Sequence, residues 1–99
     1  MERTIIGYEV RVIADTGIPA KVDYFHAKTL EEAISIAFRL SCERFPGKVG
    51  NLVKVSSNDY QVQGASITAL NGYAPAGITA LYEGNYPESN PHIARKVIV

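Results

Sequence analysis

Residues 29–47 restrict the fold more than any other part of this sequence. The motif Thr-Leu-Glu-Glu at 29–32 matches a capping box, in which Thr29 caps a helix and Glu32 reaches back to the Thr29 amide. The apolar spacing that follows predicts a helix to about Arg44, and the next Pro-Gly pair ends it. The chain therefore has one strongly encoded helix on which its other elements must pack.

This helix is apolar around most of its circumference. A narrow polar stripe is formed by Glu32, Ser35, Arg39 and Glu43. The remaining surface is formed by Leu30, Ala33, Ile34, Ile36, Ala37, Phe38, Leu40, Cys42 and Phe45. A helix lying flat on one sheet needs an apolar stripe of only about 100°. We therefore expect the sheet to curl around the helix, or a second surface to cover its flank. We expect Phe38 and Ile34 at the core centre and Cys42 as a buried core residue.

Two alternating segments before the helix, residues 5–14 and 20–27, predict a β-hairpin with a turn at 15–19. Its expected apolar face contains Ile6, Tyr8, Val10, Val12, Ala14, Ala20, Val22, Tyr24 and His26. Its expected charged face contains Glu9, Arg11, Lys21 and Asp23, with Phe25. Cross-strand pairing of these charges would stabilise the hairpin by a few tenths of a kcal/mol per pair.

After the helix, strands are predicted over 51–57 and 60–70, with a bulge or bend at Gly64. A short third strand is optional over 78–83, and residues 93–99 form a final strand, tied into the sheet or into a partner. Strands grouped around one helix indicate an α+β fold, an antiparallel β-sheet of about five or six strands packed on a central amphipathic helix. With 99 residues, the chain is expected to be a single domain, 1–99.

Composition excludes several classes of protein. Apolar residues make up 46% and charged residues 20%, which is typical of a globular domain and not of a disordered chain. Ten Lys and Arg balance ten Asp and Glu, which argues against a dedicated nucleic-acid binder. No segment approaches the roughly 18 apolar residues of a membrane span. The lone Cys42 cannot form an internal disulfide, so we expect a cytoplasmic protein.

Residues able to support catalysis are few. The imidazole and thiol groups are those of His26, Cys42 and His92, and their spacing does not supply the four close ligands of a zinc site. The sequence has no Ser/His/Asp order, dinucleotide fingerprint or metalloprotease motif. We therefore predict a protein that is not an enzyme and that uses no metal and no cofactor.

Charge is unevenly distributed along the chain. Between Val49 and Tyr82 only Lys54 and Asp59 are charged, far fewer than a free surface normally carries. This pattern, together with the wide apolar helix and the apolar C-terminus, predicts a homodimer.

The stretch 71–96 is rich in Tyr, Asn, Ser and Gly, the composition of recognition loops. Large aromatic residues and Arg carry most of the energy of protein interfaces. The predicted partner-binding residues are Tyr73, Tyr82, Tyr86, His92 and Arg95. The alternative is a surface loop whose tyrosines pack on the core.

The hairpin over 5–27 followed by Thr-Leu-Glu-Glu-Ala at 29–33 resembles a pattern found in very small phage and mobile-element proteins, some anti-CRISPR inhibitors among them. The resemblance covers about residues 1–45. It implies a non-catalytic viral inhibitor of a bacterial defence system that acts by binding. Many such inhibitors are acidic mimics of nucleic acid, whereas this chain is neutral, so blocking a protein site or sequestering a small ligand fits it better.

We predict a non-catalytic binding module that acts through protein–protein contacts. One alternative is a nucleic-acid binder with tyrosines for stacking and the basic residues Arg11, Lys21, Lys28, Lys48 and Lys54. Another is a protein that binds a small, nucleotide-like ligand between the helix and the loops at 73–86, which ligand-induced thermal stabilisation would reveal.

Overall fold

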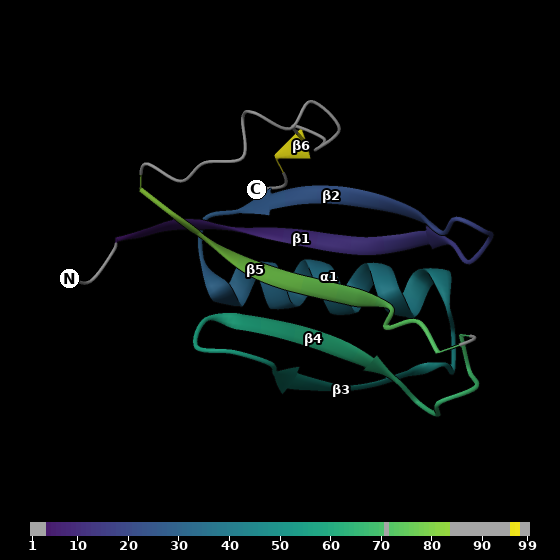
Figure 1. Ribbon diagram of the computed structural model, residues 1–99. Helices are drawn as coiled ribbons and strands as arrows, with labels where there is room; N and C mark the ends of the chain where they lie inside the picture. Colours follow the sequence, from purple (N-terminus) through teal and green to yellow (C-terminus); the bar gives the residue numbers. More distant parts are fainter. Residues whose placement is uncertain (1–3, 71, 84–95, 98–99) are drawn as a thin grey trace.

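The computed structural model describes residues 4–70, 72–83 and 96–97, which form a six-stranded sheet with one helix against one face (Figure 1). The elements are β1 (Ile5–Asp15), β2 (Lys21–Ala27), α1 (Leu30–Arg44), β3 (Val49–Lys54), β4 (Asp59–Gly64), β5 (Ala76–Tyr82) and β6 (Lys96–Val97). The strand order is β3-β4-β5-β1-β2-β6. Neighbouring strands are antiparallel except β6, which is parallel to β2. The predicted α+β fold is confirmed.

Local signals set the ends of α1. The Thr29 hydroxyl accepts a hydrogen bond from the Glu32 amide at 3.2 Å, and the helix ends at Arg44 as predicted. The return bond of the capping box is not formed, because Oε2 of Glu32 is buried without a hydrogen-bond partner among the described residues. Acidic residues in the first turn and an arginine in the last turn match the helix dipole.

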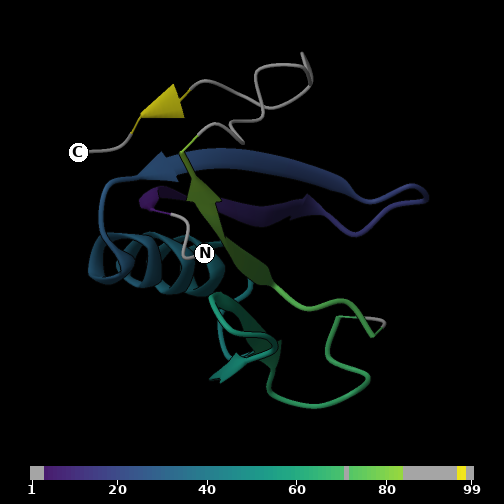
Figure 2. The same cartoon turned by 60° about the vertical axis from the view of Figure 1, so that its left-hand side comes forward.

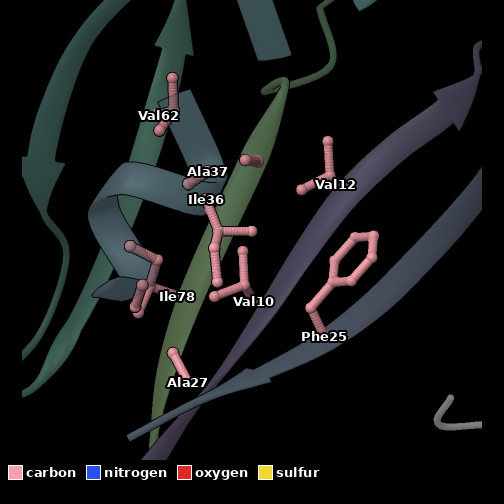
Figure 3. Close-up of a cluster of buried hydrophobic side chains, with 10 residues drawn as sticks. Val10, Val12, Phe25, Ala27, Ile36, Ala37, Val62 and Ile78 are labelled. Carbon is pink, nitrogen blue, oxygen red and sulfur yellow. The ribbon is translucent and has the colours of Figure 1, made fainter. Parts of the chain in front are cut away.

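The core lies between α1 and the sheet, where Ile36 and Ala37 point toward Val10 and Ile78 (Figure 3). Ala33 and Ala37 are fully buried, whereas Phe38 and Ile34 are only partly buried. The prediction that Phe38 and Ile34 occupy the core centre is therefore wrong. Small residues hold the central position because they allow the helix backbone to approach the sheet closely.

The prediction that Cys42 is a buried core residue is also wrong, because Cys42 is exposed. It lies seven residues after Ser35, and two helical turns bring the helix back to within about 20° of the same direction. Cys42 therefore shares the solvent-facing stripe with Ser35 and Arg39. The wide apolar arc of α1 packs against a sheet that wraps around the helix, since α1 contacts β1, β2, β3 and β5.

The hairpin register places each side chain of β2 on the opposite face of the sheet from the predicted one. Ile13 pairs with Val22, but Asp15 pairs with Lys21, so Ala14 is an extra residue in a β-bulge. A shift of one residue moves every following side chain to the opposite face. As a result Phe25 packs in the core under α1, whereas Tyr24 and its alternate neighbours lie on the opposite face.

The same bulge invalidates the predicted charge pairs of the hairpin. Asp23 faces α1 and forms an ion pair with Arg44 at 2.8 Å, rather than pairing with Glu9 or Arg11. Arg44 also donates to the carbonyl oxygens of Val12 and Ile13, at 3.5 and 3.3 Å. The end of the helix is thereby fixed to both strands of the hairpin.

The second half of the chain differs from the prediction in where its strands end. β4 stops at Gly64, so residues 65–70 are not a continuation of that strand. Leu70, which is 5% exposed, packs this segment back onto the molecule, and the Ala65 amide donates to the Lys48 carbonyl. β5 is longer than the optional strand predicted and lies in the middle of the sheet.

Two residues of the predicted final strand are described. They form β6 and pair with Phe25 and His26 of β2, which ties this part of the chain into the sheet as expected. None of the helical segments among the described residues is long and apolar enough to cross a membrane.

Candidate functional site

The sheet has an open face, defined here as the face away from α1. Strand alternation places on it the residues between the core positions: Glu9, Arg11, Ile13, Val22, Tyr24, His26, Asp59, Gln61, Gln63, Gly77 and Thr79. Among the described residues no helix covers this face (Figure 1). The accessible part of this face is a natural place to look for a binding surface.

The two ends of the open face differ in exposure. At one end Glu9 lies between its cross-strand neighbours His26 and Thr79, and both Glu9 and His26 are 8% exposed. At the other end Arg11 lies between Tyr24 and Gly77, and here the surface is hollowed. The accessible polar chemistry is therefore concentrated at the Arg11 end.

A hollow of about 300 Å³ lies over β1, β2 and β5 at this end. Its lining residues are Arg11, Ile13, Val22, Tyr24, Gln61, Ala74, Ala76 and Gly77. A second hollow of about 410 Å³ adjoins it on the side of β4. Its lining residues are Gln61, Gln63, Gly64, Ala65, Ser66, Ile67, Gly72, Tyr73 and Ala74. Gln61 and Ala74 line both hollows, so the two are neighbours, and together they are called the depression here.

Two segments project from the sheet at this end of the molecule and are called the arms here. They are the β1–β2 turn (residues 16–20) and the segment between β4 and β5 (residues 65–70 and 72–75). The β1–β2 turn and the segment between β4 and β5 leave the sheet at the same end of the molecule in both views (Figures 1 and 2). In the turn, the Asp15 carboxylate accepts a bond from the Gly17 amide at 3.2 Å, and the adjacent Ile18 is 98% exposed. In the other segment Ile67 is 86% exposed. Each arm thus presents a large aliphatic side chain to solvent.

The structure separates the predicted partner-binding residues. Tyr73 is 39% exposed and lines the larger hollow. Tyr82 lies at the opposite end of β5, where its hydroxyl accepts a hydrogen bond from the Asn58 amide group at 2.7 Å. Tyr86, His92 and Arg95 lie outside the described residues. Of the predicted set, only Tyr73 contributes to the depression described here.

The polar lining residues that sequence reasoning missed are Tyr24, Gln61, Gln63 and Ser66, whereas Arg11 was named as a binding residue only among the basic residues considered for nucleic acid. The pattern Gln-Val-Gln at 61–63 carries a signal that the two amides share a face, because residues two apart in a strand point to the same side of the sheet. Tyr24 was assigned to the core because the Ala14 bulge is not visible in the sequence. Arg11 was interpreted as one half of a hairpin ion pair.

The polar side chains of the described lining are one guanidinium, two amides, two phenols and the hydroxyl of Ser66, with no carboxylate among them. Such groups donate and accept hydrogen bonds but include no metal-ligand cluster, and the described residues contain no group of three or more His, Cys, Asp or Glu that could hold a metal ion. Cys42 lies on the helix, away from this face.

Of the basic residues considered for nucleic acid, only Arg11 lines the depression. Comparisons with protein-family models, curated proteins and solved structures give no match to this chain. Its function is therefore argued from the geometry of the open face.

Proposed function

We propose that this protein is a non-catalytic binding module that contacts another protein through a recognition surface at the hollowed end of the open face. This recognition surface consists of Arg11, Ile18, Tyr24, Gln61, Gln63, Ile67 and Tyr73. The observation that carries the proposal is that Ile67, which is 86% exposed, lines the larger hollow, while Ile18, which is 98% exposed, lies in the turn that leaves the sheet at the same end of the molecule. Single exposed aliphatic residues are common on protein surfaces, but two at the same end of the molecule, one of them in the wall of a hollow, favour an interface.

The neutral character of the region supports this proposal. The segment from Val49 to Tyr82, which supplies β4, β5 and one arm, carries only Lys54 and Asp59 as charged side chains. The centres of protein interfaces are depleted in charged residues and enriched in Tyr and Arg. Tyr24, Tyr73 and Arg11 around uncharged Gln61 match that composition.

Site-specific photocrosslinking tests the proposal in the cells that produce the protein. A photoreactive amino acid is placed at Ile18, at Ile67 and, as a control, at Ser35 on the exposed stripe of α1. We expect one and the same protein to be captured from positions 18 and 67 and not from position 35. Equal capture from all three positions, or no capture from the two arms, would contradict the proposal.

A homodimer is a second proposal, and it now depends on one feature. The sheet wraps around the helix, and β6 pairs with β2, so a partner subunit is not needed for either. The charge-poor segment from Val49 to Tyr82 still favours self-association. Sedimentation equilibrium tests it: we expect a dimer mass that Ile67→Glu reduces, whereas a folded monomer at high concentration would contradict it.

The narrower function of inhibiting a bacterial defence system rests on the resemblance of residues 1–45 alone, as the cytoplasmic location rests on the lone cysteine. A plaque assay in defended cells with and without the expressed protein tests it. We expect plaque numbers to rise with the protein and to fall again when Ile18 and Ile67 are both changed to Asp.

A further inference from the structure

We propose that Arg11 is a receptor for a carboxylate, so that the recognition surface takes a peptide segment of its partner with an Asp or Glu side chain seated on the Arg11 guanidinium. This inference rests on the proposed function and specifies the chemistry of the partner. Three features of the Arg11 environment carry it.

The first feature is the position of the guanidinium, which lies against the backbone of β5. A Cβ atom at Gly77 would lie 2.6 Å from Nη2 of Arg11 and 3.4 Å from both Cζ and Nε. The guanidinium therefore occupies the space that a side chain at position 77 would fill. A glycine opposite Arg11 in the register lets the arginine lie flat on the strand, at the edge of the smaller hollow.

The second feature is that Arg11 has no hydrogen-bond acceptor and no ion-pair partner among the described residues. Arg44 shows the contrast, because it is similarly half-buried but is bound by Asp23 and by two backbone carbonyls. Glu9 lies two residues before Arg11 on the same face, yet it forms no ion pair with it. The planar row of N–H donors on Arg11 is thus available to a carboxylate, which it can bind through two parallel hydrogen bonds.

The third feature is the charge of the depression. Among the residues that the structure describes, Arg11 is the only charged one in the lining of either hollow. One guanidinium neutralises one carboxylate, whereas a phosphate monoester carries about −1.5 to −2 charges at neutral pH and would remain partly unneutralised. The charge balance therefore favours a carboxylate over a phosphate monoester.

The amide groups beside Arg11 favour a peptide as the carrier of that carboxylate. Gln61 lines both hollows and Gln63 lines the larger one, so both lie along the depression that leads away from Arg11. Each glutamine amide both donates and accepts hydrogen bonds, as a peptide backbone does. The exposed Ile18 and Ile67 on the two arms would contact apolar side chains that flank the acidic residue.

A random peptide library, displayed and selected on the full chain, tests the inference without knowledge of the natural partner. Selections are run on the wild type, on Arg11→Glu and on Arg39→Glu, a matched charge reversal on the exposed stripe of α1. Circular dichroism confirms that each variant is folded. We expect the wild type and Arg39→Glu to enrich peptides with Asp or Glu at one fixed position, and Arg11→Glu to enrich Lys or Arg there.

The best peptide is then synthesised with Glu and with Gln at the selected position. We expect the wild type to prefer the Glu peptide by about tenfold, a typical effect of a hydrogen bond to a charged group, and Arg11→Gln to bind both peptides equally. Gly77→Ala should reduce the preference in the same way, because the new methyl group meets the end of the flexible Arg11 side chain and displaces it.

Several outcomes would overturn the inference. These are wild-type selections without an acidic position, an acidic preference that survives Arg11→Glu, and displacement of the Glu peptide by inorganic phosphate at concentrations where acetate has no effect. If photocrosslinking at Ile18 and Ile67 still captures one protein in those cases, the proposed function stands and only the carboxylate chemistry is wrong. Acidic peptides with no capture from the arms would instead contradict the proposed function alone.

Discussion

The two faces of the sheet are built from alternate residues of the same strands, yet they have opposite properties. Under α1, Val10, Val12 and Ile78 are fully buried and contact small helix residues such as Ala37. On the open face, Arg11 lies between Val10 and Val12 in sequence, at the edge of a hollow, and has no ion-pair partner within the described part of the chain. The volume and shape of the side chains determine which residues fit on the face under α1, whereas the open face can carry polar groups.

The two half-buried arginines make the same comparison at the level of single side chains. Arg44 connects the end of the helix to Asp23 and to the backbone of β1. Arg11 rests on Gly77 without an acceptor among the described residues. We infer that substitutions on the helix side mainly change stability, whereas substitutions on the open face mainly change binding. The following predictions test that division.

The largest difference is expected between two isoleucines. Ile78 is fully buried under α1 and Ile67 is 86% exposed on an arm. Ile78→Ala should lower the free energy of unfolding by about 2–5 kcal/mol, through lost burial and the cavity that remains. Ile67→Ala should change it by less than about 0.5 kcal/mol. Urea denaturation of both variants measures the difference, and similar losses would mean that the arm packs on the molecule in solution.

The second prediction concerns the helix surface. Ala37 is fully buried against the sheet, and Phe38 lies on the flank of the core. Ala37→Phe should destabilise the fold by about 1–3 kcal/mol, because the larger side chain forces the helix away from the sheet. Phe38→Ala should cost less than the roughly 3–5 kcal/mol of a fully buried phenylalanine. A larger loss for Phe38→Ala than for Ala37→Phe would show that the helix is rotated from the position described.

The rotation of this helix shows what the sequence can and cannot determine. The helix ends follow from local chemistry, because the Thr29 side chain bonds to an amide only three residues away. The rotation depends on which residues allow the closest approach to the sheet. With an apolar arc this wide, the sequence did not distinguish Ala33 and Ala37 from the larger Phe38 as the central residues.

The recognition surface was less predictable, for reasons that can be located in the chain. The extra residue Ala14 reverses the faces of β2, and no turn residue marks it, so Tyr24 was assigned to the wrong side. Residues 65–70 were predicted as part of a strand, but β4 ends at Gly64 and Leu70 packs back onto the molecule. Tyr73, which lines the larger hollow, was selected from composition, since Tyr in a polar loop is typical of recognition.

The third prediction compares the two arginines. Arg44→Ala removes an ion pair that is about one-third exposed together with two hydrogen bonds to carbonyls, so a loss of about 1–2 kcal/mol in the free energy of unfolding is expected. Arg11→Ala should change stability by less than about 0.5 kcal/mol, because it has no partner to lose among the described residues. High salt should reduce the difference between the two variants. Equal losses at low salt would indicate that Arg11 is engaged within its own chain.

The smallest effect on stability is expected for a substitution at Gly77. There an added Cβ meets a flexible side chain, whereas at Gly50 it meets the backbone of a neighbouring strand. A Cβ at Gly77 would lie 2.6 Å from Nη2 of Arg11, and a Cβ at Gly50 would lie 2.8 Å from the carbonyl oxygen of Gly64. The first contact is relieved by turning one flexible side chain, whereas the second requires β3 and β4 to separate. Gly77→Ala should therefore leave the melting temperature nearly unchanged, and Gly50→Ala should lower it by several degrees, the shift of about 1 kcal/mol in a domain of this size. Differential scanning calorimetry of the two variants decides between these cases. A clear loss at Gly77 would mean that the guanidinium is held in place by more than the missing side chain.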